Sequence, residues 1–470
     1  MRALTQWRFD RPLLPMAAVG MALVGGVWIA WLISEGSWRT LALLCVMGIL
    51  PLALRWPVTL TFGAYAFVLP FSHVALFADS GGVSGARLIG IVAIGAFAAA
   101  GLVQKRLVKP PAPALWAIAL VLWAITTLFW SVSPEEALIS LPTILSILAL
   151  YLAAVCFRVS ERELRIVCLL AMIGGLLAVM AGVLSGFEAD ASHADVRSRM
   201  TVAGQEGNPN AVASGLLLPM GMAIGLLFSS RAVLGRAIAV TAIVAIGAGI
   251  FLTVSRANLL ALTIMLCVLL VRSRKRWHLV AVVGVLAGLL LFMPDILFQR
   301  IDMLISGEDT TGSGRTDIWT SGLALLSRFG WFGSGLQTWS IVYMAYGSGI
   351  KYRGSHNSYL MVWVELGVVG LALLLMMIFA HLRLAWRTSG RTSEGGFPVA
   401  IEAACCAVLV ALFFSDDLWA KNTWLSLILA VWASRNSLLG TSRSRSTRAE
   451  LAGESLDNVG EDPGHAATRH

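Results

Sequence analysis

This 470-residue chain is short of charge, since Asp, Glu, Lys and Arg make up only 13% of it. Soluble proteins carry about 25% charged residues and about 45–50% apolar ones. Here 58% of the residues are hydrophobic, and so few charges cannot cover a water-soluble fold of this size. The composition excludes a soluble enzyme and a nucleic-acid-binding module. It predicts an all-α polytopic membrane protein, because lipid-exposed backbone must satisfy its own hydrogen bonds.

Cysteine patterns and nucleotide motifs are missing as well. The six cysteines all lie inside apolar segments, where cysteine behaves as a small hydrophobe, so no disulfide framework is expected. The chain has no G-x-x-x-x-G-K-[ST] and no H-E-x-x-H, which excludes ATP hydrolysis by a P-loop and a zincin-type metal site. We therefore expect no cofactor and no metal.

Long apolar runs are what the chain has instead. A helix needs about 20 such residues to cross a bilayer. The runs predict about 12–14 transmembrane helices, at 13–34, 40–55, 58–77, 86–104, 114–131, 137–157, 165–185, 208–229, 237–254, 257–272, 278–296, 358–382, 399–415 and 421–437.

The distribution of basic residues predicts the orientation. With the N-terminus inside, about two thirds of the Lys and Arg fall in segments that face the cytoplasm, as the positive-inside rule requires. Both termini are then cytoplasmic. The predicted domains are membrane helices 1–11 over 1–296, a large outward loop at 297–357, C-terminal membrane helices over 358–437, and a disordered cytoplasmic tail at 438–470.

The large loop is predicted to carry an amphipathic helix. Thr316 caps its start, and apolar residues including Trp319 then recur at helical spacing as far as Phe329. We expect this helix to lie flat on the bilayer surface, with Trp331, Phe332 and Trp339 at the interface beside it. Long ordered loops of this kind are usually functional.

Three arginines are candidates for binding an anion. Arg256 lies in TVSRANLLAL between two apolar runs with almost no loop, so it faces a watery cavity or a bound anion, or it snorkels to the headgroups. Arg315 lies in TGSGRTDIW at the predicted helix start, where its guanidinium fork and free N–H groups suit phosphate oxygens. The alternative is a solvated arginine that pairs with Asp317. Arg87, at the outer start of its span, is a weaker candidate.

His356 is the candidate proton acceptor. It lies in RGSHNSYLMVWVELG, where the loop re-enters the membrane, and histidine exchanges a proton readily near neutral pH. Arg353 precedes it, and Asn357 or Glu365 is predicted to orient the imidazole. A lone histidine is more often structural, which is the alternative here. Asn210, in GNPNAVASG, is interpreted chiefly as a helix cap.

Five segments together resemble the O-antigen ligase and polymerase family of bacterial envelope glycan enzymes. They are GNPNA at 207–211, SR at 255–256, GSGRTDIW at 312–319, the G-x-G turn at 333–335, and HNSYL with ELGVVG at 356–370. They occur in the family's order, with the large loop between SR and HN, and the resemblance covers roughly 200–380 of the sequence.

The resemblance implies a GT-C-like glycosyltransferase at the periplasmic face of the bacterial inner membrane. The implied donor is a glycan on undecaprenyl diphosphate, and the acceptor is lipid A–core in a ligase or another repeat unit in an O-antigen or exopolysaccharide polymerase. The family's paired arginines match Arg256 and Arg315, and its catalytic histidine matches His356.

The expected reaction needs no metal and inverts the anomeric centre. The arginines stabilise the diphosphate leaving group while the imidazole takes the proton of the acceptor hydroxyl. The partners are the lipid-linked donor, the acceptor and membrane lipids, with no nucleic acid. A ligase is the leading hypothesis, and the sequence does not separate it from a polymerase. A transporter or flippase and a structural scaffold are the alternatives from other classes.

Overall fold

A computed structural model of the chain describes residues 51–71, 85–184, 187–189, 198–200, 209–273, 276–290, 315–347, 353–389 and 396–437. The predicted span at 13–34, most of that at 40–55 and the tail at 438–470 lie outside these residues. The chain forms two compact units, Met1–Pro57 and Val58–His470. Of the first, the structure describes a short helix at 51–55.

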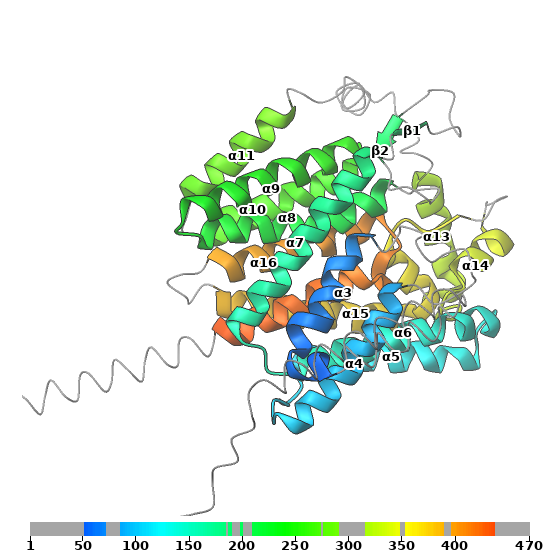
Figure 1. The fold of residues 1–470 in the computed structure, drawn as a ribbon. Coiled ribbons are helices and arrows are strands. Elements are labelled where there is room, and N and C mark those ends of the chain that lie inside the picture. Colours follow the sequence, from blue (N-terminus) through cyan, green and yellow to red (C-terminus); the bar gives the residue numbers. More distant parts are fainter. Residues whose placement is uncertain are drawn as a thin grey trace, which may run out of the picture. The chain divides into compact units, whose positions relative to one another are not determined.

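From Pro57, the last residue of the first unit, the chain continues as a series of apolar helices and two short strands. In chain order it contains η1 Pro57–Phe62, α3 Gly63–Val68, η2 Leu69–Phe71, α4 Gly85–Val103, α5 Ala112–Thr126, η4 Thr127–Phe129, α6 Pro134–Val155, α7 Glu161–Leu184 and the short antiparallel strands β1 Phe187–Ala189 and β2 Ser198–Met200 (Figure 1).

The second half continues with longer helices. It contains α8 Pro209–Ser229, α9 Val233–Leu252, α10 Arg256–Arg272, α11 Arg276–Leu290, α13 Arg315–Phe329, α14 Trp339–Tyr346, α15 Ser358–Ser389, α16 Gly396–Ala411, η6 Leu412–Phe414, η7 Asp417–Trp419 and a helix at 421–437, the final helix.

The fold is that of an all-α polytopic membrane protein, as the composition predicts. Within the described ranges, eight helices are long and apolar enough to cross a bilayer, and each matches a predicted span between 86 and 415. The helices α10, α11 and 421–437 also fall on predicted spans, but each is 17 residues or fewer. The remaining helices of the predicted 12–14 fall wholly or partly on residues outside the described ranges.

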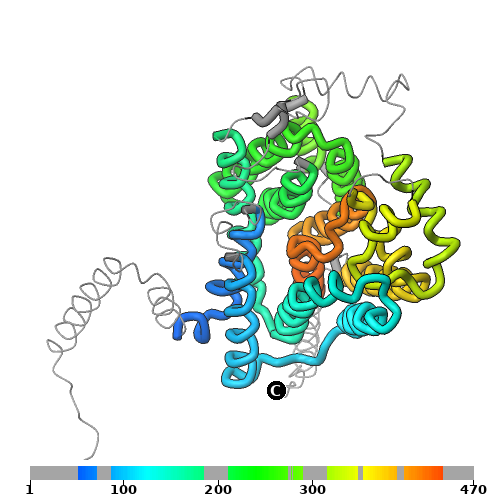
Figure 2. Tube along the Cα trace, turned by 90° about the vertical axis from the view of Figure 1, so that its right-hand side faces the viewer, coloured from blue at the N-terminus to red at the C-terminus, as the bar shows by residue number. Residues whose placement is uncertain are grey.

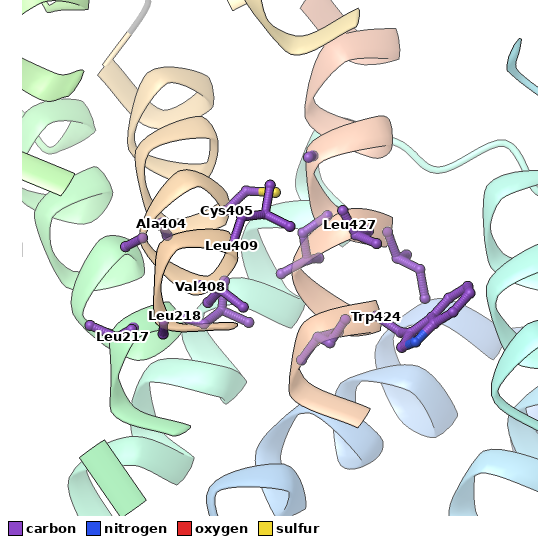
Figure 3. Packing of buried hydrophobic residues seen from close by; sticks show 14 of the residues in the cluster. Leu217, Leu218, Ala404, Cys405, Val408, Leu409, Trp424 and Leu427 are labelled. Carbon is purple, nitrogen blue, oxygen red and sulfur yellow. The ribbon is translucent and has the colours of Figure 1, made fainter. Parts of the chain in front are cut away.

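The best-packed region lies between α8, α16 and the final helix. Figure 3 shows Leu217 and Leu218 of α8 facing Ala404 and Val408 of α16, all of them buried. A Cβ added at Gly221 would lie 2.4 Å from the Cβ of Ala404. Small residues therefore let these helix backbones approach closely, which is how helices associate inside lipid.

The predicted loop helix is present as α13, but its apolar face covers protein. Ile318 and Leu325 are buried, and a Cβ at Gly322 would lie 2.7 Å from the Trp339 ring and 2.8 Å from Leu360. This face therefore packs on protein, where the prediction had it on the bilayer surface. Figures 1 and 2 show α13 beside the neighbouring yellow helices α14 and α15. Trp339 is also buried, at 3% exposure, so its predicted interfacial position is wrong.

Trp331 and Phe332 are exposed, at 76% and 66%, in the turn that follows α13. We call the end of the second unit that carries α13, this turn and α14 the outer end. The turn is joined to the end of α5, because Trp130 Nε1 donates to Phe332 O (3.2 Å) and the N–H of Val132 donates to Ser334 O (2.8 Å). The outer end of α5 and α6 is thereby fixed against the loop.

Candidate active site

A break in α15 is the scaffold of the site. Gly367 has φ +70° and ψ −173°, so the helix is interrupted about three turns after the HN segment. The interruption frees backbone groups, and the 330–335 turn pairs with them. The N–H of Val368 donates to Gly330 O (2.8 Å), and the N–H of Ser334 donates to Val364 O (2.9 Å). Irregular backbone at membrane depth is tolerated where protein satisfies it in this way.

The glycines of the G-x-G and ELG motifs are required because the 330–335 turn docks against the break in α15. Gly333 and Gly335 have φ of +83° and +113°. A Cβ at Gly333 would lie 2.1 Å from Glu365 O, and one at Gly367 would lie 2.3 Å from Trp331 O. Only glycine fits where two backbones meet in these conformations.

Glu365 holds the next part of the same loop. Its buried carboxylate accepts the N–H of Gln337 on Oε2 and the N–H of Trp339 on Oε1, both at 3.0 Å. Trp339 in turn donates from Nε1 to Arg353 O (3.2 Å), three residues before His356. Glu365 therefore acts on the loop backbone, and the structure shows no hydrogen bond from it to the imidazole that it was predicted to orient.

The HN segment is held by side chains on either side of the histidine. Asn357 caps α15, since its Oδ1 accepts the N–H groups of Tyr359 (3.0 Å) and Leu360 (3.1 Å). The Ser355 hydroxyl donates to Asp416 and accepts the N–H of Asn357 (3.1 Å). Asn357 is thus a backbone cap, and Asp416 is the carboxylate that this segment contacts.

His356 itself has φ +48°, a left-handed conformation that is uncommon for a residue with a side chain. Burial lowers the pKa of its imidazole below the ordinary value. The charge of Asp416 opposes this shift, whereas Arg315 and Arg353 add to it, and Asp417 opposes it more weakly. The imidazole is therefore held neutral near pH 7, in the state that accepts a proton.

Arg315 and Arg256 lie close enough for their charges to interact. Burial lowers the pKa of the Arg315 guanidinium, the nearby Arg256 lowers it further, and Asp416 opposes the shift. Arg315 is the first residue of α13 and Arg256 the first of α10, so each stands at a helix N-terminus, which itself favours an anion. Arg315 therefore interacts electrostatically with both Arg256 and His356, and we call these three residues, linked through the charge of Arg315, the cluster.

The GNPNA and SR segments meet at the start of α10. Ser255 Oγ donates to Asn210 Oδ1 (2.6 Å), and Asn258 Nδ2 donates to Asn210 O (3.0 Å). Val254, just before, has φ +52°. Asn210 therefore joins the starts of α8 and α10 and fixes where Arg256 emerges, which goes beyond the cap predicted for it.

The other predicted residues lie around this cluster. Trp319 Nε1 donates to Ser355 O (3.1 Å), so α13 is attached to the HN segment. Arg353 acts on the imidazole through its charge. Arg87 lies near Lys421, the first residue of the final helix.

Asp416 is the residue that the sequence reasoning missed. It stands in SDDLWAK, a short turn between two spans, and it contacts Ser355, while a Cβ at Gly354 would meet its Oδ2 at 2.2 Å. An acidic pair in a loop of an otherwise charge-poor chain was the available signal. Spacing gave no reason to bring residue 416 to residue 356.

The fold and this cluster define a helical membrane protein with a cationic site beside a neutral histidine at one end of the bundle. Residues 241–375 match the family model for O-antigen ligase, which confirms the predicted resemblance to that family over this part of the chain. No curated protein matches the chain significantly.

Among solved structures, the chain is similar to one chain in a study of how a peptidoglycan synthase complex coordinates polymerization and crosslinking. The two are 17% identical with a TM-score of 0.41, over 69% of this chain and 97% of the other. A similarity this weak carries no argument about function.

Proposed function

We propose that the protein transfers a glycan from undecaprenyl diphosphate to an acceptor hydroxyl, with inversion and without a metal. The observation that supports the proposal is that Arg315 interacts electrostatically with both Arg256 and His356, while a hydrogen bond from Trp319 to Ser355 O holds the Arg315 helix against the HN segment. Two cations and a neutral base that are linked in this way match a reaction in which an anionic group leaves and a hydroxyl loses its proton. The family of residues 241–375 supports a lipid-linked glycan as the donor.

The leaving group explains the arginines. When the bond from sugar C1 to the phosphate oxygen breaks, its electron pair stays on the lipid diphosphate, whose negative charge grows. Guanidinium groups bind such oxygens in pairs of parallel hydrogen bonds. Because Arg256 and Arg315 are anchored at helix starts, they stabilise this charge without reorganising during the reaction.

The hydroxyl explains the histidine. As the acceptor oxygen attacks C1 from the face opposite to the diphosphate, His356 takes its proton, and the anomeric configuration inverts. Asp416 is a positioning residue, because it holds Ser355 and its charge stabilises the imidazolium once formed. Arg353 keeps the imidazole neutral beforehand. Glu365, Asn357, Asn210 and Trp319 hold the backbone around these groups.

We place this chemistry at the periplasmic face of the bacterial inner membrane in a GT-C-like enzyme, since the basic loops mark the opposite end as cytoplasmic. We favour lipid A–core as the acceptor, and thus an O-antigen ligase. A polymerase of O-antigen or exopolysaccharide repeats uses the same groups. Deletion of the gene separates the two: a ligase mutant accumulates lipid-linked polymer, whereas a polymerase mutant lacks long chains on the carrier.

The test is transfer by purified protein in detergent, with lipid-linked donor and acceptor and no ion gradient. We expect His356→Ala to lower turnover about 10²–10⁴-fold, and Arg315→Lys to be nearly as damaging as Arg315→Ala, because an ammonium lacks the guanidinium fork. Arg328→Lys, at the other end of α13, is the matched control. Turnover of His356→Ala at half the wild-type rate refutes the proposal, and so does a strict need for a gradient.

A further inference from the structure

A cavity of about 220 Å³ lies at the end of the helices opposite to the site, which we call the inner end. Two connecting loops and the final helix meet there. The N–H of Val108 donates to Cys156 O (2.8 Å), and Trp432 of the final helix donates from Nε1 to Ala154 O (2.8 Å). Because α5 has 15 residues, this cavity lies about 22 Å along the helix from the outer end.

The cavity combines an apolar wall with polar groups at its rim. Val108, Phe157, Val159 and Trp432 line it, together with Arg158, Arg435 and Asn436. A ligand that fits this lining has an apolar part and an anionic part. A small soluble anion satisfies only the arginines and leaves the apolar wall uncovered.

The polar groups at the rim are incompletely paired. Asn436 Nδ2 is buried and has no hydrogen-bond partner within the described ranges. Arg435 donates to the carbonyls of Val155 and Lys109 but contacts no carboxylate there, and Arg158 forms no ion pair among the described residues. Burying an amide N–H without an acceptor is unfavourable, so an oxygen atom that accepts from Asn436 stabilises this arrangement. The exposed Arg158 and the half-buried Arg435 add positive charge that attracts an anion.

The loops around the cavity are also positively charged. Six cations stand in or beside the two loops: Lys105, Arg106, Lys109, Arg158, Arg162 and Arg165. Glu163 neutralises Arg106 (2.6 Å) and Glu161 neutralises Arg165 (2.6 Å), which leaves a net positive surface. Basic pockets between helices on the cytoplasmic side of a membrane bind anionic lipid headgroups.

We propose that this cavity binds one anionic phospholipid of the cytoplasmic leaflet, with its phosphate on Arg158 and Arg435 and its ester oxygens toward Asn436. One acyl chain lies against Val108 and Val159. This site stands apart from the transfer reaction and does not depend on the function proposed for the outer end.

The experiment compares lipids retained by the full-length protein after reconstitution with phosphatidylcholine alone or mixed with phosphatidylglycerol. Native mass spectrometry counts the lipids that survive removal of loosely bound ones. We expect wild type to retain one phosphatidylglycerol in preference to phosphatidylcholine. Arg158→Gln should weaken that retention about fivefold, the worth of one cation beside a membrane anion.

The matched control is Arg165→Gln, which removes the same charge at the same end but outside the cavity lining. Val108→Phe fills the cavity from its half-exposed rim and should also abolish retention, while size-exclusion chromatography and transfer activity report intact folding. Equal retention of both lipids overturns the proposal. Equal losses in Arg158→Gln and Arg165→Gln, or undiminished retention in Val108→Phe, overturn it too, since the cavity is then not the site.

Discussion

The backbone break at Gly367 gives the sharpest prediction, through the substitution Gly367→Ala. With φ +70° and ψ −173°, this residue lies in a region of backbone space that is essentially restricted to glycine. The added Cβ would lie 2.3 Å from Trp331 O and 2.6 Å from Trp331 C. Both obstacles are backbone atoms, so no side chain can rotate away to relieve them.

The free-energy cost of Gly367→Ala depends on whether the turn stays docked under strain or moves away. Backbone strain at such a residue costs about 1–3 kcal/mol. If the turn moves away, it loses the bonds from Val368 N to Gly330 O, from Ser334 N to Val364 O and from Gly335 N to Glu365 O. At about 0.5–1.5 kcal/mol each, these bonds sum to about 2–5 kcal/mol, so either response weighs about 1–5 kcal/mol against the docked state.

Hydrogen–deuterium exchange of the peptide covering 330–340 measures this directly. A loss of about 1–5 kcal/mol corresponds to roughly 5-fold to 5 × 10³-fold faster exchange, up to the limit set by local opening. Transfer activity should fall with it, because the same turn leads to Trp339. The control is Gly95→Ala in α4, where an added Cβ meets nothing within 4 Å and should leave exchange unchanged. Equal exchange in the two variants refutes the docking argument.

Three further predictions concern single groups. Glu365→Ala leaves two buried N–H groups unpaired, so thermal unfolding in detergent should show a loss of about 2–6 kcal/mol; an unchanged midpoint contradicts this. Arg353→Gln should move the acidic limb of kcat/KM to higher pH and Asp417→Asn to lower pH, because the first charge lowers and the second raises the pKa of the site imidazole, which is active when neutral; shifts of one sign refute it. Tyr151→Phe removes the buried hydrogen bond to His381 Nε2 (2.8 Å) and should cost about 1 kcal/mol of stability without changing turnover. A changed pH profile of turnover would contradict a purely structural role for this bond.

Elements whose partners are local in sequence were predictable. Helix α13 begins at Arg315, one residue before the predicted cap, because capping and apolar periodicity act within a few turns. The spans α4 to α9 and α15 to α16 follow from apolar length alone. The ordered motifs also identified the family later confirmed over residues 241–375.

Contacts between distant segments were not predictable from spacing. Glu365 lies nine residues after His356 and was predicted to orient it, yet the backbone break at Gly367 makes its carbonyl and carboxylate available to residues 333–339 instead. Asp416 lies 60 residues away and contacts the HN segment. The sequence shows where an acidic residue lies along the chain, but the partner of its carboxylate is determined by tertiary packing.

The environment of α13 shows the same limit. Its periodicity predicted a helix with one apolar face, which is correct, but a face of that width fits a bilayer surface or a protein groove equally well. Only the structure shows which of the two is correct: the absence of a side chain at Gly322 lets Trp339 and Leu360 pack against the helix.

Backbone strain independently marks the same place in the fold. Among the residues that the structure describes, four non-glycine residues have positive φ: Lys105, Val254, Gln337 and His356. Three of them adjoin the cluster, since Val254 precedes the Ser255–Arg256 step and Gln337 is held by Glu365. Such conformations cost about 1–3 kcal/mol each and persist only where the surroundings fix them. Hydrogen bonds accepted by Asn210, Glu365 and Asp416 do so here, and they fix the backbone conformation from which the side chains of Arg256 and His356 extend.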